Sequence, residues 1–226
     1  MIEEILPAEV LSAEAFDDQL LGQLGPSAVL FPEEAAVVAM AVPQRQQQFA
    51  TVRALARRAL AQLGLPPVPL LPNRRGAPQW PDGVVGSMTH CDGYRAAVVA
   101  RAVETLAIGI DAEPHGPLPE GILDAISLPL ERWWIRELTE RDPGVCWDRL
   151  LFSAKESVFK AWYPLTGLEL GFEEAEVSFE PDQGMFSARL LRTGPVVAGR
   201  ELGGFSGRWL VRDGLVTTVI ALSATQ

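Results

Sequence analysis

The pattern of apolar and polar residues predicts two helices in the N-terminal part of the chain. The segment 7–24 carries apolar side chains at helical spacing, namely Phe16, Leu20, Leu21 and Leu24. The segment 44–63 does so more regularly, with an apolar face of Phe49, Val52, Ala56, Leu60 and Leu63. Gly64 supplies a stop for this helix. The stretch 65–81 is rich in proline and arginine, which suits neither a helix nor a central strand, so it predicts a long loop of the kind that is often functional.

Strand patterns begin after this loop. The expected strands are 84–89 and 94–101, which flank a turn at Asp92-Gly93, and 106–113. A helical region is expected over 119–141, ended by Asp142-Pro143-Gly144, and a further helix over 147–162. The C-terminal part returns to strands, at 175–180, 186–191, 207–211 and 216–222. The last two flank Asp213-Gly214, which is a strong hairpin signal.

The order of elements is similar in the two halves of the chain. Each half has helix, then strands, and no close sequence repeat accompanies this order. We therefore expect an α/β (α+β) fold with two pseudo-duplicated lobes, each a helix packed on an antiparallel sheet. The expected lobes are residues 1–113 and 114–226. A ligand site is expected between them, because ligand sites favour such interfaces.

Composition narrows the class of ligand. The chain has 226 residues, 48% hydrophobic and 21% charged, as in an ordinary soluble globular protein. A net charge of −10 argues against a nucleic-acid partner, and the apolar runs are far shorter than the ~20 residues that cross a membrane. The arginines nevertheless cluster at positions 45, 53, 57, 58, 74 and 75, which suits a small polyphosphate. Cys91 and Cys146 have no metal-ligand or redox spacing, so we expect free thiols in a reducing cytoplasm.

The segment Ile108–Glu113 predicts a pair of carboxylates on one face of a strand. Alternate residues of a strand share a face, so Gly109, Asp111 and Glu113 are expected to point away from the core, with open space beside Gly109. Two neighbouring carboxylates repel each other unless a cation or a proton lies between them. Carboxylates of this kind suit Mg²⁺, which completes its ligand shell with water and phosphate. The alternative is a solvated pair at a strand end.

A second cluster lies on the helix that contains Phe152–Lys160. Glu156 and Lys160 are four residues apart and share a helix face. One interpretation is an exposed ion pair, which contributes only about 0.3–0.5 kcal/mol. The other places Glu156 as a third oxygen group at the metal, with Lys155 and Lys160 neutralising phosphate.

A third cluster, Gly86–His90, ends a strand with small and hydroxyl residues before a histidine. These groups can donate hydrogen bonds to an anion, although a lone histidine is more often structural. A nucleophilic pair of Cys91 with His90 is disfavoured, because adjacent residues of an extended chain point apart.

Together these motifs resemble the phosphopantetheinyl transferase superfamily, of the type that activates surfactin and enterobactin synthetases. The family pattern of a Gly-(Ile/Val)-Asp-x-Glu strand and a (Phe/Trp)-x-x-Lys-Glu-(Ala/Ser)-x-x-x-Lys helix stands at Gly109–Glu113 and Phe152–Lys160. The resemblance extends to Arg45-x-x-x-Phe49-x-x-x-Arg53, Arg75-Gly76-Ala77-Pro78-x-Trp80-Pro81 and Gly86–Ala97. It covers most of 45–172 and is closest to actinobacterial members, through Thr89-His90-Cys91 and Asp111-Ala112-Glu113-Pro114-His115.

The resemblance implies a role for each matching residue. Mg²⁺, or Mn²⁺ in its place, would be held by Asp111, Glu113 and Glu156, with the backbone of Ala112. Coenzyme A would be bound by Arg45, Arg53, Arg74, Arg75, Gly76, Thr89 and His90, with Asp111 and Glu156 at its pyrophosphate. Lys155 and Lys160 would face the phosphates and act with Glu156 in catalysis, Glu156 as metal ligand or as general base. Two departures are Glu169, where many relatives carry Trp, and Pro72-Asn73, where relatives can carry a basic residue.

The resemblance also implies an activity. Phosphopantetheine would move from coenzyme A to a serine of an acyl or peptidyl carrier protein, with release of 3′,5′-ADP, in polyketide or nonribosomal peptide biosynthesis. We expect a cytoplasmic monomer, with no nucleic-acid or membrane partner. The carrier contact is expected to be local and apolar, involving Trp133, Trp134 or the helix around Trp162. Two alternatives are a module that binds coenzyme A or a carrier without chemistry, and a metal-dependent phosphohydrolase.

Overall fold

Two antiparallel sheets form the framework of the chain. The computed structural model describes residues 1–18, 29–197 and 199–224. The first sheet has the order β1-β3-β2, with β1 at Leu11–Ala15, β2 at Val84–Cys91 and β3 at Tyr94–Arg101. The strands β2 and β3 form a hairpin in which Cys91 pairs with Tyr94, so the predicted Asp92-Gly93 turn is confirmed.

A long helix packs on the first sheet. Helix α2 spans Pro43–Gln62, as its apolar face predicted, and a short α1 at Pro32–Val38 precedes it. The apolar side chains of α2 meet those of β1 and β3 in a core that includes Leu55, Leu60 and Val99. Residues 65–81 form the predicted loop, which folds back on itself through a bridge between Pro72 and Pro78.

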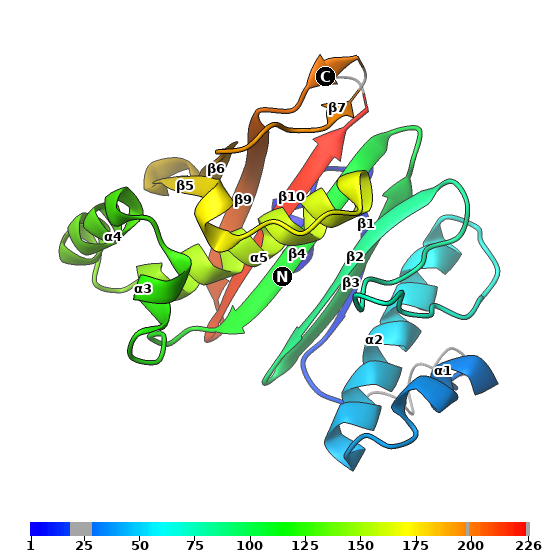
Figure 1. Cartoon of the computed structure of the whole chain (residues 1–226). Coiled ribbons are helices and arrows are strands. Elements are labelled where there is room, and N and C mark those ends of the chain that lie inside the picture. Colours follow the sequence, from blue (N-terminus) through cyan, green and yellow to red (C-terminus); the bar gives the residue numbers. More distant parts are fainter. Residues whose placement is uncertain (19–28, 198, 225–226) are drawn as a thin grey trace.

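The second sheet is larger and has the order β4-β10-β9-β6-β5. Its strands are β4 (Thr105–Pro114), β5 (Ala175–Glu180), β6 (Met185–Leu190), β9 (Gly204–Arg212) and β10 (Leu215–Ser223). Helix α5, Trp147–Thr166, lies across β4 and β10 (Figure 1). Its buried residues Trp147, Leu151 and Trp162 pack with Phe186 and Val216 of the sheet. The predicted α/β class, with helices on antiparallel sheets, is confirmed.

The remaining elements are short or peripheral. Helices α3 (Ile122–Ile126) and α4 (Pro129–Arg141) connect β4 to α5. A two-stranded ribbon of β7 (Val196–Val197) and β8 (Arg200–Glu201) follows β6. The part of the chain that the structure describes also has 3-10 turns at Ile2–Ile5, Phe172–Glu174 and Pro181–Gln183.

Side-chain hydroxyls join the two sheets along β2 and β4. The backbone amide of Ile110 donates to Ser87 Oγ, and that of Ala112 donates to Thr89 Oγ1, both at 3.1 Å. On the face of β4 away from α5, Ile108 and Ile110 enter a third apolar cluster together with residues of β3. The predicted alternation along β4 is thereby confirmed.

The predicted helix over 7–24 is wrong for the residues that the structure describes. Leu11–Ala15 is strand β1, in which Leu11 pairs with Val99 and Ala15 with Arg95. Ala13 and Ala15 alternate into the core beneath α2, so the period is two rather than 3.6. Leu20, Leu21 and Leu24 lie outside the described residues.

The helical region predicted over 119–141 contains two helices, α3 and α4. Pro129 stands at the first turn of α4, where its fixed backbone starts a helix and restricts the preceding residue to extended backbone. The carboxylate of Glu131 accepts the Leu128 amide at 2.7 Å, which caps this new start.

The division into lobes 1–113 and 114–226 stays a prediction. Strand β4, which precedes the predicted boundary, pairs with β10 along its whole length and lies beside β2. It therefore carries contacts to both sheets (Figure 1). Within the described residues, the helices are too short or too polar to span a bilayer.

Candidate active site

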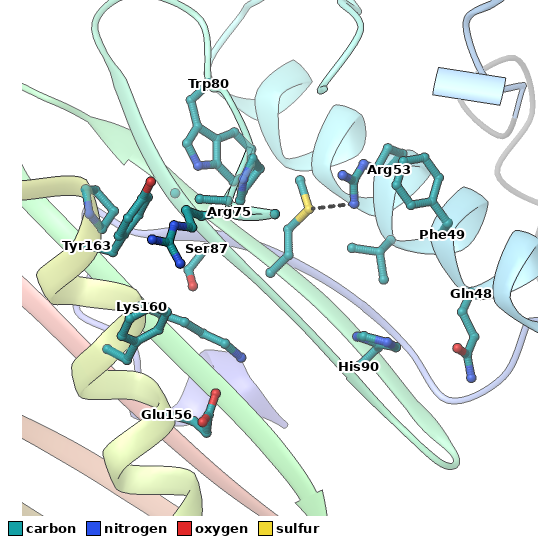
Figure 2. Close-up of a pocket in the computed structure, with 18 of the residues that line it drawn as sticks. Gln48, Phe49, Arg53, Arg75, Trp80, Ser87, His90, Glu156, Lys160 and Tyr163 are labelled. Carbon is teal, nitrogen blue, oxygen red and sulfur yellow. Dashed lines mark hydrogen bonds between the residues drawn. The ribbon is translucent and has the colours of Figure 1, made fainter. Parts of the chain in front are cut away.

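A cavity of about 290 Å³ opens between α2 and α5. Figure 2 shows its two walls, with Gln48, Phe49, Arg53 and His90 on the α2 side and Glu156, Lys160 and Tyr163 on α5. The loop after α2 contributes Arg75, Gly76 and Trp80. Of the predicted site residues, the cavity is lined by Arg45, Arg53, Arg75, Gly76, His90, Glu156 and Lys160.

The α5 wall reaches β4 because Gly109 has no side chain. A Cβ atom on Gly109 would lie 1.9 Å from the carbonyl oxygen of Ser157 and 2.9 Å from the amide nitrogen of Ala161. The predicted open space beside Gly109 is therefore filled by the backbone of α5, and that prediction is wrong. This close contact sets α5 against β4 and brings Lys160 to Asp111.

Asp111 is buried at the junction of β4 and α5, with 4% of its surface exposed. Its Oδ1 atom accepts hydrogen bonds from Lys160 Nζ at 2.7 Å and from Thr89 Oγ1 at 3.3 Å. Among the described residues, its Oδ2 atom is buried without a hydrogen-bond partner. A buried, unpaired carboxylate oxygen is costly and is expected to take a ligand, such as a cation.

Two further carboxylates share the electrostatic environment of Asp111. Burial raises the pKa of Glu156, the charge of Asp111 adds to the rise, and Lys160 opposes it. Burial and Asp111 likewise raise the pKa of Glu113, although Arg149 Nη1 lies 2.9 Å from its carboxylate. Across the described part of the chain, Glu156 makes no hydrogen bond or ion pair, so its carboxylate is available to a ligand.

The donor set fits a hard divalent cation that shares its shell with a ligand. No three Asp, Glu, His or Cys side chains of the described residues are gathered closely enough to enclose a metal by themselves. Mg²⁺ does not need such a cage, because it commonly takes one or two carboxylates and completes its shell with water and phosphate oxygens. The unpaired Asp111 Oδ2 provides one such oxygen, and the Ala112 amide is already bonded to Thr89.

The opposite wall carries positive charge. Arg45 Nη1 lies 2.7 Å from His90 Nε2. Desolvation of the ring, with the charges of Arg45 and Lys160, lowers the pKa of His90 to about 4, so the imidazole is neutral and accepts the hydrogen bond. The guanidinium of Arg53 is buried, lies 3.8 Å from the centre of the Phe49 ring and donates to the Leu70 carbonyl at 3.1 Å. These contacts fix two cationic groups at one end of the cavity.

The proline-rich loop delivers Arg75 to the cavity through a tight turn. Asn73 Oδ1 accepts the amides of Arg75 at 2.9 Å and Ala77 at 3.1 Å. Gly76 has a φ of +84°, a conformation that favours glycine. Arg74 is exposed and lies outside the cavity lining.

Lys155 is directed away from the cavity. Its ammonium donates to the carbonyls of Phe172 at 2.7 Å and Ala175 at 2.9 Å, and lies 2.9 Å from Glu131 Oε2. Burial lowers the pKa of Lys155, with Glu131 opposing the shift. All three N–H donors are satisfied inside the protein, so in this structure Lys155 connects α5 to α4 and β5 instead of facing a phosphate site.

Several cavity residues escaped the sequence analysis. Phe159 and Tyr163 line the cavity from the same helix face as Glu156 and Lys160, and Gln48 does so beside Arg45. Each of them lies three residues after a predicted site residue on the same helix, and residues at this spacing are neighbours on the helix surface. This spacing is the signal that could have identified them. Thr89, by contrast, was predicted in the pocket and lies behind it, holding Asp111.

The cavity has Arg45 and Arg53 on one wall and Glu156 with Lys160 on the other, an arrangement that suits a polyphosphate ligand. The family model described as the 4′-phosphopantetheinyl transferase N-terminal domain matches residues 33–100. The model of the 4′-phosphopantetheinyl transferase superfamily matches residues 107–206.

Curated relatives agree with the family models. The chain is 62% identical to "4′-phosphopantetheinyl transferase Svp" of Streptomyces mobaraensis over 224 residues, which are 99% of this chain and 90% of that protein. It is 48% identical to "4′-phosphopantetheinyl transferase PptT" of Mycobacterium tuberculosis over 225 residues, 96% of this chain and 98% of the relative. "Enterobactin synthase component D" of Salmonella typhi is 31% identical over 141 residues, 60% of this chain and 55% of that protein.

The chain therefore belongs to the 4′-phosphopantetheinyl transferase superfamily. Members of this superfamily transfer phosphopantetheine from coenzyme A to a serine of a carrier protein.

Proposed function

We propose that the chain carries out this transfer with Mg²⁺, or Mn²⁺ in its place, in the cavity between α2 and α5. The observation that carries the proposal is the buried Asp111 Oδ2 atom, which has no partner among the described residues and lies on the strand that α5 contacts. Asp111 and Glu156 would hold the metal, with Glu113 as a further carboxylate and the backbone of Ala112 beside them. When bound, the metal would neutralise the pyrophosphate and the charge that develops on the leaving oxygen.

The reaction breaks the phosphoanhydride bond of coenzyme A and forms a phosphodiester on the carrier serine. The carrier serine Oγ forms a bond to the β-phosphorus of coenzyme A, and the bond from that phosphorus to the bridging oxygen breaks. 3′,5′-ADP leaves with the electron pair of that bond, and the serine proton goes to a base. If Glu156 does not bind the metal directly, it is the candidate for this base, because its carboxylate lines the cavity and has no hydrogen-bond or ion-pair partner among the described residues.

The cationic wall supports binding of the nucleotide end. Arg45, Arg53 and Arg75 line the cavity and are proposed to hold the phosphates of 3′-phosphoadenosine, with His90 as a neutral group that orients Arg45. Lys160 bridges Asp111 and the cavity, so it is proposed to move towards the pyrophosphate when coenzyme A binds. Preorganised charge of this kind is usually the largest catalytic contribution.

The partners follow from the same proposal. The acceptor is an acyl or peptidyl carrier protein, which places the chain in polyketide or nonribosomal peptide biosynthesis in the cytoplasm, acting as a monomer. Trp133 and Trp134 are about half exposed on α4 and are candidates for the apolar carrier contact, whereas Trp162 is buried.

The test is intact-protein mass spectrometry of an apo carrier protein incubated with the enzyme, coenzyme A and Mg²⁺. We expect a gain of one phosphopantetheine, about 340 Da, which is lost with EDTA and restored by excess Mg²⁺. Asp111→Asn should reduce the rate at least about 100-fold, whereas the matched charge change Asp182→Asn, in an exposed pair with Arg141, should not.

Other outcomes assign other functions. Binding of coenzyme A without a mass gain on several carriers would indicate a binding module. Release of 3′,5′-ADP without a carrier would indicate a phosphohydrolase, and full activity in EDTA would contradict the metal site.

A further inference from the structure

Two side-chain contacts connect the proline-rich loop to the end of α5 at the cavity. Asn73 Nδ2 donates to Tyr163 Oη at 3.3 Å, and Arg75 Nη1 forms an ion pair with the carboxylate of Glu169. Arg75 and Tyr163 both line the cavity, and Figure 2 shows them on its α5 side. The loop is therefore joined to the α5 wall by contacts that involve two cavity residues.

The backbone on both sides of the Arg75–Glu169 pair is held in place. On the loop side, Asn73 Oδ1 accepts the Arg75 amide, so the Arg75 main chain is fixed. On the other side, Trp162 Nε1 donates to the Leu168 carbonyl at 3.0 Å and Arg192 Nη1 to the Glu169 carbonyl at 3.3 Å. The pair can therefore open by side-chain rotation alone.

The carboxylate of Glu169 forms an ion pair with the guanidinium of Arg75, which lines the cavity proposed to bind phosphate. The Nη1 donor that Arg75 directs to Glu169 is not available to a phosphate at the same time, so a phosphate that takes this donor must displace the carboxylate. Both side chains are more than half exposed, at 61% for Arg75 and 64% for Glu169. The pair is thus weak enough for a phosphate to displace it.

We propose that Glu169 occupies Arg75 in the free enzyme and is displaced by a phosphate of coenzyme A, so that Glu169 sets the affinity for this substrate. The inference rests on the proposed function, because it takes coenzyme A as the ligand of the cavity. Removal of the Glu169 charge frees Arg75 and removes repulsion of the incoming phosphate. Glu169 is thus a specificity-determining residue that lowers affinity.

The test is calorimetric titration of coenzyme A into Glu169→Gln and the unaltered chain, with KM measured beside it. We expect Kd and KM for coenzyme A to fall about two- to fivefold, the range that an exposed ion pair allows, and kcat to change less. Asp182→Asn is the matched control, because it also removes one exposed acidic charge paired with an arginine. It should leave Kd unchanged.

A double-variant cycle distinguishes the effect of the Arg75–Glu169 ion pair from the effect of removing one negative charge near the cavity. In an Arg75→Ala background, Glu169→Gln should no longer tighten binding. Equal tightening in that background, an equal effect of Asp182→Asn, or an unchanged Kd in Glu169→Gln would each overturn the proposal. If the unaltered chain fails to bind coenzyme A at all, the proposed function fails instead, so the two failures are distinguishable.

Discussion

At the scale of single residues, the acidic side chains of the site differ in whether their oxygens have hydrogen-bond or ion-pair partners in the protein. Asp111 Oδ1 accepts hydrogen bonds from Lys160 and Thr89, whereas its Oδ2 has no partner among the described residues. Burial raises the pKa of Glu156, and the charge of Asp111 adds to the rise against the opposing charge of Lys160. Such uncompensated charge destabilises the folded chain and is characteristic of functional sites.

The first prediction concerns Glu156→Gln in metal-free protein. The pKa of Glu156 is raised in the folded state, so its ionisation destabilises the folded protein. The free energy of unfolding therefore falls as the pH rises from the ordinary value of 4.5 through the folded-state pKa. We expect the variant to melt about 2–4 °C higher at pH 7, with the difference vanishing near pH 4. Transfer should fall about 100-fold or more.

Thermal unfolding between pH 4 and 8, with the mass assay at pH 7, measures both effects. A variant that is less stable than the parent at pH 7 would show that Glu156 is compensated by a group in the protein. The Asp182→Asn variant controls for the change in net charge.

At the scale of elements, Gly109 determines how closely α5 approaches β4. The second prediction is that Gly109→Ala lowers the free energy of unfolding by about 3 kcal/mol and greatly reduces activity, because its Cβ would overlap the Ser157 carbonyl. Gly116→Ala is the matched control, since a Cβ there meets nothing within 4 Å. It should change stability by less than about 0.5 kcal/mol. Denaturant unfolding measures the free energy of unfolding of both variants. Similar values for Gly109→Ala and Gly116→Ala would contradict the tight contact between α5 and β4.

The buried pair of Lys155 and Glu131 is the second connection between elements. Glu131 accepts the amides of Leu128 and Val177 as well as the Lys155 ammonium, so it joins α4, α5 and β5. Breaking a buried pair leaves an uncompensated charge, which is more costly than removing both partners.

The third prediction is therefore that Lys155→Met destabilises the chain by about 3–5 kcal/mol, and that adding Glu131→Gln restores part of the loss. Denaturant unfolding measures this, and remaining activity should follow the folded fraction. A stable variant with kcat reduced about 100-fold would instead support the predicted role of Lys155 at the phosphates.

At the scale of the whole molecule, the site depends on segments far apart in the sequence. Arg45 on α2, Arg75 in the loop and Glu156 on α5 line one cavity, while Asp111 lies on β4 between the two sheets. The net charge of −10 coexists with this cationic wall, because the arginines are gathered on α2 and the loop that follows it. An overall acidic charge therefore does not describe the local field that a polyphosphate meets.

The sequence by itself determined most of the elements and singled out the carboxylates that the proposed site uses. Helix 44–63, the hairpin at Asp92-Gly93 and the alternation along Ile108–Glu113 were predicted because local spacing and turn chemistry dictate them. The resemblance likewise selected seven of the residues that line the cavity, since short motifs keep their spacing wherever the elements are placed.

Only the tertiary structure decided which side chains are engaged and which are free. Leu11–Ala15 became a strand because β3 offers it a pairing edge, a contact that local periodicity does not contain. Lys155 and Glu156 are adjacent in sequence, but helix geometry turns one towards Glu131 and the other towards the cavity. The unpaired Asp111 Oδ2 and the Arg75–Glu169 pair likewise depend on distances between elements, which the sequence does not specify.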